Sequence, residues 1–75
     1  MDKELINEFI TSLSEAIDSE VIITAETQLN DIDWDSLAMI STIAIADEKF
    51  NKILDPDLLG KCKDINEIVR LIDNS

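Results

Sequence analysis

The stretch Asp35–Phe50, with the sequence DSLAMISTIAIADEKF, decides the fold of this chain. Asp35 is a favourable N-cap, and the pattern that follows predicts a helix from about Ser36 to Phe50. One apolar stripe of this helix lies in a narrow sector and is expected to face the core; it consists of Met39, Ile43, Ala46 and Phe50. A second apolar stripe lies roughly 100–130° around the helix and consists of Leu37, Ile40 and Ala44. A bundle helix needs one buried face, so the second stripe is either covered by the rest of the chain or is a docking surface.

Three further helices are predicted around this one. Residues 2–18 form an amphipathic helix that begins at Asp2, and its apolar side chains repeat every four residues: Leu5, Phe9, Leu13 and Ile17. A one-turn helix is indicated by an Asp cap, a Pro at the first helical position and a Gly stop, in Asp55-Pro56-Asp57-Leu58-Leu59-Gly60. An Asp64-x-x-Glu67 variant of the capping box opens a last helix, which ends near Asp73. The fold class is therefore all-α: a small four-helix bundle of three longer helices and one short helix, with a long first loop.

The long first loop, residues 19–35, has no helical period. Its β-branched run Val21–Thr24 has no second strand to pair with, so we expect an extended loop. Leu29 and Ile32 would hold this loop against the core, and Trp34 is either a further anchor or a contact with a partner. Loops of this length in small domains are often functional.

The composition of the chain limits the classes of function that it can have. The chain has 75 residues, which predicts one domain over residues 1–75, with 6 basic and 17 acidic side chains and a net charge of −11. This charge repels nucleic acid and anionic lipid and favours basic patches on proteins.

With no histidine and one cysteine, the chain has no Ser-His or Cys-His pair and no zinc site of thiolate and imidazole ligands. Cys62 fits a reducing cytoplasm; we expect it to pack as a small hydrophobe, although Lys61 and Lys63 would lower the pKa of an exposed thiol. The longest apolar run, Ile43–Ala46, is far shorter than the about 20 residues that span a bilayer, so we expect no membrane insertion.

The spacing Asp31-x-Asp33-x-Asp35 resembles the start of a calcium-binding EF-hand loop. Such a loop requires glycine at its sixth position and glutamate at its twelfth, and these positions hold Ser36 and Thr42. We therefore expect no metal site beyond weak binding of divalent ions at the surface.

Ser36 stands where the long loop enters the second helix. A serine at a helix start is most often a cap. A group attached there would also lie close to unpaired backbone N–H donors and the positive end of the helix dipole, which favours an anion. No histidine is present to activate the hydroxyl. Ser36 is therefore better interpreted as an attachment point than as a catalytic nucleophile, and we expect the chain not to be an enzyme.

With this Asp-Ser-Leu at the start of the second helix, the chain resembles the acyl carrier proteins, which are acidic four-helix domains of about this length. The resemblance covers nearly the whole sequence, through Asp31-Ile32, Asp47–Asn51, Leu54 and Ile65–Ile72. It implies that a phosphopantetheinyl transferase attaches 4′-phosphopantetheine covalently to Ser36, with coenzyme A as donor, and that the arm carries acyl intermediates as thioesters. Asp35 and Leu37 flank the attachment site. The resemblance also implies a face for partner enzymes with basic docking patches, formed by Leu37, Ile40, Ala44, Asp47 and Glu48.

Two departures from the family pattern matter. Asp33 stands where the family usually has glycine, so the turn must form without glycine's freedom, although aspartate tolerates left-handed geometry. Ala38 and Ser41 occupy positions where carriers of fatty acid synthesis tend to have acids, which points to a dedicated pathway. The alternatives are an aminoacyl or peptidyl carrier with the same arm, and an acidic helical adaptor without a prosthetic group. We expect a monomer.

Overall fold

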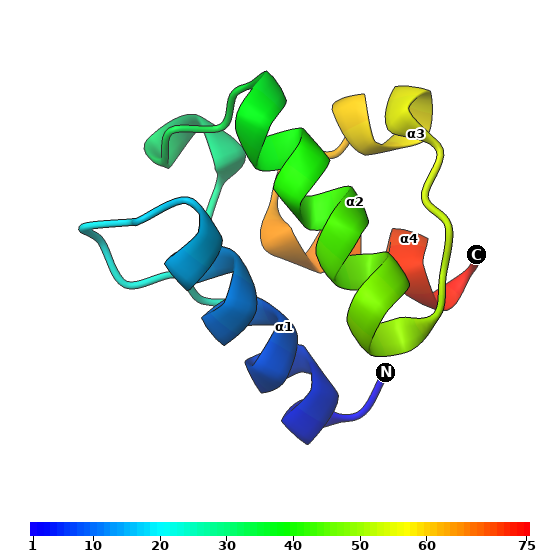
Figure 1. The fold of residues 1–75 in the computed structure, drawn as a ribbon. Helices are drawn as coiled ribbons and strands as arrows, with labels where there is room; N and C mark the ends of the chain where they lie inside the picture. The colour runs from blue at the N-terminus through cyan, green and yellow to red at the C-terminus, as the bar shows by residue number, and fades with distance from the viewer.

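Four α-helices follow one another along the computed structural model, which describes residues 1–75 (Figure 1). They are α1 (Lys3–Ala16), α2 (Ser36–Phe50), α3 (Pro56–Gly60) and α4 (Ile65–Asp73), and a short 3-10 helix, η1 (Leu29–Asp31), lies in the long connection. No β-strand forms, and an isolated bridge joins Gln28 and Asp64. The prediction of three longer helices and one short helix is confirmed, and Val21–Thr24 forms no strand, as expected, but η1 within the long loop was not predicted.

Every α-helix begins after an aspartate whose carboxylate accepts a backbone N–H of the first turn. The caps Asp2, Asp35, Asp55 and Asp64 accept, in this order, from Leu5 N (3.0 Å), Ala38 N (2.9 Å), Asp57 N (2.9 Å) and Glu67 N (2.8 Å). Such a cap contributes about 0.5–2 kcal/mol and fixes where a helix starts. The return half of the predicted capping box is displaced, because the Glu67 carboxylate accepts from Lys63 N at 2.9 Å rather than from the backbone of Asp64.

The core lies between α1, α2 and α4. In Figure 1, α1 and α2 run side by side in opposite directions, and α4 lies behind them. Phe9 of α1 is fully buried, and its ring centroid lies 6.4 Å from that of Phe50. Most of the remaining core comes from α1, α4 and the segments around α3, through Leu13, Leu54, Leu59, Ile65, Ile68, Val69 and Ile72.

The buried face of α2 differs from the predicted stripe. Ala46 is buried as expected, but the other three members, Met39, Ile43 and Phe50, are only partly buried. The buried residues of α2 are Ala38, Thr42, Ile45 and Ala46. α2 contacts both α1 and α3, and the single turn of α3 covers less of α2 than the 14 residues of α1. The core-facing sector of α2 is therefore rotated away from the Met39 side.

The two ends of the chain lie close together at one end of the bundle (Figure 1). The N-terminal amino group pairs with the Asp73 carboxylate, and Lys52 Nζ donates to the backbone oxygen of Ser75 at 3.0 Å. The first of these is the one salt bridge in the structure. The other sixteen acidic side chains therefore have no ion-pair partner. None of the helices has the length and apolar character needed to cross a membrane.

Candidate functional site

Ser36 is the first residue of α2, and Asp35 rather than Ser36 caps this helix. Asp35 Oδ1 accepts the N–H of Ala38 at 2.9 Å. The Ser36 side chain is exposed, and its hydroxyl makes no hydrogen bond with the protein. The prediction that Asp35 caps this helix is confirmed, and Ser36 is not a cap. Its hydroxyl is available at the surface, and the start of the helix does not depend on it.

The backbone around Ser36 is suited to an anion. The N–H groups of Ser36 and Leu37 donate to no acceptor in the protein, because the first intrahelical bond is made by Met39 N to Asp35 O at 3.0 Å. These free donors add to the positive end of the dipole of a 15-residue helix. A phosphodiester bonded to the Ser36 oxygen would lie next to them. The residues present therefore fit an attached phosphopantetheine arm.

The loop that leads to Ser36 is held by apolar side chains. Leu29 is buried, while Ile32 and Trp34 are partly buried and pack on the core. The prediction of Trp34 as a loop anchor is confirmed. The backbone turns at this point through a hydrogen bond from Trp34 N to Ile32 O at 2.8 Å. Asp33 does not have a positive φ, so this turn needs neither glycine nor left-handed geometry.

Near Ser36, the second apolar stripe of α2 is open to solvent. Leu37 is 70% exposed, Ile40 is 62% exposed and Ala44 is also exposed. Asp47 and Glu48 are exposed one turn further along the same helix. The alternative that α3 and the first loop cover this stripe is therefore wrong. The residues that sequence analysis grouped as partner-facing do share one exposed side of α2 next to Ser36.

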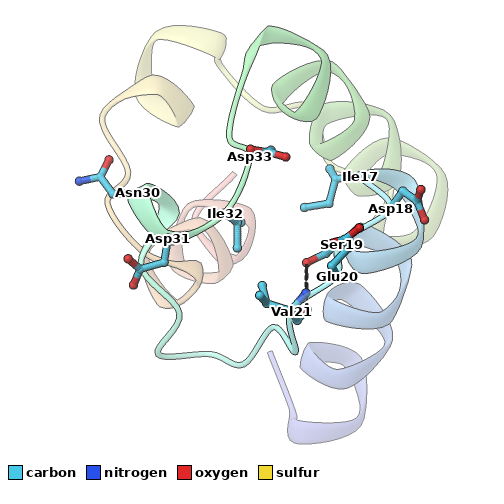
Figure 2. Close-up of a pocket in the computed structure, with 9 residues that line it drawn as sticks. All are labelled: Ile17, Asp18, Ser19, Glu20, Val21, Asn30, Asp31, Ile32 and Asp33. Carbon is cyan, nitrogen blue, oxygen red and sulfur yellow. Dashed lines mark hydrogen bonds between the residues drawn. The ribbon is translucent and has the colours of Figure 1, made fainter.

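A hollow of about 400 Å³ lies beside this site, and Figure 2 shows its lining. One wall comes from the end of α1 and the turn after it, and the other from η1 and the loop before α2; the lining residues are Ile17, Asp18, Ser19, Glu20, Val21, Asn30, Asp31, Ile32 and Asp33. A second hollow of about 300 Å³ shares three of these residues and extends to Leu37 and Ser41 of α2. No group of three Cys, Asp or Glu side chains is arranged to hold a metal ion.

The residues that the segment directly after α1 contributes to this hollow were not predicted. Asp18, the second residue after α1, has a φ of 51° in the turn that leads into the first loop. Its distance in sequence from the Asp-Ser-Leu motif hides its place in the lining of the hollow. Its left-handed φ is a feature of the structure, and no signal in the sequence marks this position.

Cys62 lies apart from this site, between α3 and α4. It is half-buried, and its Sγ–H donates to Leu58 O at 3.6 Å. Burial raises the pKa of the thiol, and the nearby Glu67 and Asp64 carboxylates raise it further. The prediction that it packs as a small hydrophobe is confirmed, and Lys61 and Lys63 do not lower its pKa.

With this geometry established, comparison with known proteins gives one family. The sequence matches the family model described as a phosphopantetheine attachment site over residues 5–72. The chain belongs to this family of carrier domains. Its members are non-catalytic carriers with 4′-phosphopantetheine bonded covalently to a conserved serine. Phosphopantetheinyl transferases load these carrier domains, which deliver to partner enzymes. Searches of curated proteins and of solved structures give no significant match.

Proposed function

We propose that this carrier domain holds acyl intermediates as thioesters on a 4′-phosphopantetheine arm attached to Ser36 and delivers them to partner enzymes. One observation carries the assignment to Ser36. Of the six serines, it is the one whose side chain is exposed and free of hydrogen bonds. The other exposed serine, Ser75, donates its hydroxyl proton to Leu71 O at 2.7 Å.

The chain's own residues prepare and hold the attachment point. Asp35 satisfies the N–H of Ala38, so the Ser36 hydroxyl is not engaged in capping. The free N–H groups of Ser36 and Leu37 would stabilise the negative charge of the phosphodiester. The arm, when bound, supplies a terminal thiol that activates a carboxyl group for transfer. The chain has no histidine, and we assign the base that activates Ser36 to the transferase. We therefore assign the chain no catalytic activity of its own.

The docking face in this proposal is the exposed side of α2, formed by Leu37, Ile40, Ala44, Asp47 and Glu48. Full burial of a leucine or isoleucine side chain contributes about 1.5–3 kcal/mol. Leu37 and Ile40 are 70% and 62% exposed, so each retains more than half of this for a partner. A small apolar patch with acids beside it suits a partner groove that is rimmed by Lys or Arg. Such an interface forms rapidly and releases readily, as delivery to successive enzymes requires.

The exposed face of α2 also gives an argument about the pathway that this carrier serves. Its first two turns contain no acidic residue, and the partner enzymes of fatty acid synthesis would lack charges to grip there. This absence supports a dedicated pathway, with acyl cargo as the first candidate and aminoacyl or peptidyl cargo as the second. Ala38 does not contribute to this argument because it is buried. The lone thiol of Cys62 supports a location in the cytoplasm, where thiols stay reduced.

A labelling experiment tests the assignment to Ser36. The purified chain is incubated with a broad-specificity phosphopantetheinyl transferase and a fluorescent coenzyme A analogue. We expect label on the wild type and on Ser41→Ala, the matched control on the same helix, and none on Ser36→Ala. Label retained by Ser36→Ala would overturn the assignment.

A second experiment identifies the cargo. The thioester is trapped on the loaded carrier in a lysate of the source cells and its mass is determined. A carboxylic acid without an amino group supports the acyl assignment. An amino acid or peptide would replace it with the aminoacyl alternative.

A further inference from the structure

A groove between α3 and α4 takes no part in the site at Ser36. It has a volume of about 310 Å³ and is lined by Leu58, Lys61, Cys62, Glu67, Arg70 and Leu71. Leu58 is 47% exposed, and Cys62 and Leu71 are half-buried. The floor of this α3–α4 groove is therefore apolar and open to solvent.

The α3–α4 groove lies on the side of α3 that faces away from α2. Leu59 is the buried residue of α3, and at about 100° per residue Leu58 and Gly60 lie on opposite flanks of it. A methyl group placed on Gly60 would lie 3.7 Å from the Met39 methyl group of α2, so the Gly60 flank faces α2. Leu58 lies on the other flank and lines the groove. A molecule bound there would leave the docking face on α2 free.

The charge of the groove differs from that of the rest of the chain. Residues 49–75 contain five of the six basic side chains and five of the seventeen acidic ones, so the net charge of −11 comes from residues 1–48. Lys61 and Arg70 are exposed beside the groove and form no ion pair. Glu67 is the one acid of the lining, and its Oε2 accepts the N–H of Lys63 at 2.9 Å. The lining therefore has a net positive charge.

An apolar floor between two unpaired cations is complementary to one kind of surface. It matches apolar side chains with carboxylates on either side of them. A phosphate backbone would offer no apolar group to Leu58 and Leu71. A shallow groove between two helices suits the apolar face of a third helix.

We propose that the α3–α4 groove docks an acidic amphipathic helix of a partner protein. Leu58 and Leu71 contact the apolar face of that helix, and Lys61 and Arg70 pair with its carboxylates. The inference goes beyond the proposed function and does not depend on the arm at Ser36. It gives the carrier a second surface of opposite charge, by which one protein can hold it while an enzyme occupies the docking face on α2.

A peptide titration tests this charge complementarity. The probe is an amphipathic helical peptide of leucine, alanine and glutamate, added to the full chain and followed by NMR at low and at physiological salt. We expect shifts at the groove residues, and a Kd that rises about 3- to 10-fold at low salt in the double variant Lys61→Gln/Arg70→Gln. Lys3→Gln/Lys49→Gln is the matched control: it gives the same net charge by removing two exposed lysines outside the groove, and should change Kd by less than about 2-fold.

A second pair of variants tests the apolar floor. Leu58→Ser should weaken binding of the peptide more than Ile53→Ser, because Ile53 is 84% exposed but lies outside the groove. Equal Kd values for the two double variants, or peptide-induced shifts that spare the groove, would overturn the inference. Shifts of the groove residues that depend on protein concentration without peptide would assign the groove to a second copy of the chain, and would also overturn it. No step uses the loading of Ser36, so the inference and the proposed function can fail separately.

Discussion

An isoleucine-to-alanine substitution made on each of the two faces of α2 tests most sharply which face is buried and which is exposed. Ile45 is 8% exposed within the core, and Ile40 is 62% exposed on the docking face. Ile45→Ala removes buried methyl groups and leaves a cavity, at a cost of about 2–5 kcal/mol of unfolding free energy. Ile40→Ala removes groups that are mostly in water and should change that free energy by less than about 0.5 kcal/mol.

These magnitudes predict a clear difference in thermal unfolding. For a domain of this size, 1 kcal/mol shifts Tm by about 4–8 °C, so Ile45→Ala should lower Tm by at least about 8 °C. Ile40→Ala should keep a Tm within a few degrees of wild type while weakening transferase binding. Circular dichroism melts and calorimetric titrations measure the two effects. Equal losses of Tm in both variants would refute the assignment of Ile40 to an exposed face.

Three further predictions follow from packing and charge. Phe9→Ala should lower the free energy of unfolding by about 3–5 kcal/mol and Phe50→Ala by clearly less, because Phe9 is fully buried and Phe50 only partly. Chemical denaturation measures both losses, and a larger loss for Phe50→Ala would contradict this prediction. The raised pKa of Cys62 means that its thiolate forms only at higher pH than in an unhindered peptide; its alkylation should therefore be slower at neutral pH, and an equal rate in the folded protein would refute the burial argument. A net charge of −11 with one salt bridge predicts that sodium chloride at 0.5 M raises Tm above its value at 10 mM, whereas a fall would show that like-charge repulsion does not limit stability.

Much of the fold could be predicted because its signals are local. Each helix start depends on one aspartate and on N–H groups within three residues of it, so Asp2, Asp35, Asp55 and Asp64 could be found by inspection. The same holds for the end of α3 at Gly60. The grouping of Leu37, Ile40 and Ala44 on one side of α2 was also predictable, since helical geometry alone places them together.

The features that could not be predicted from the sequence depend on tertiary contacts. The buried sector of α2 is set by the unequal cover that α1 and α3 give it, and nothing within the helix sequence encodes their lengths or positions. Thr42 illustrates the difficulty, because its hydroxyl donates to Ala38 O at 2.8 Å and is thereby satisfied in the core. At the site, Ser36 was identifiable from its motif. The hollow next to Ser36 was not, because Asp18 and Asp33, which both line it, are 15 residues apart in the sequence.

The central claim is that Ser36 bears the arm. Its most direct test is to incubate the chain with unmodified coenzyme A and a phosphopantetheinyl transferase, digest it, and sequence the peptides by tandem mass spectrometry. We predict a gain of one phosphopantetheinyl group, located on Ser36 within the peptide that contains Asp35 and Leu37. A chain that gains no mass while a control carrier is loaded, or that carries the group on a different serine, would contradict the account.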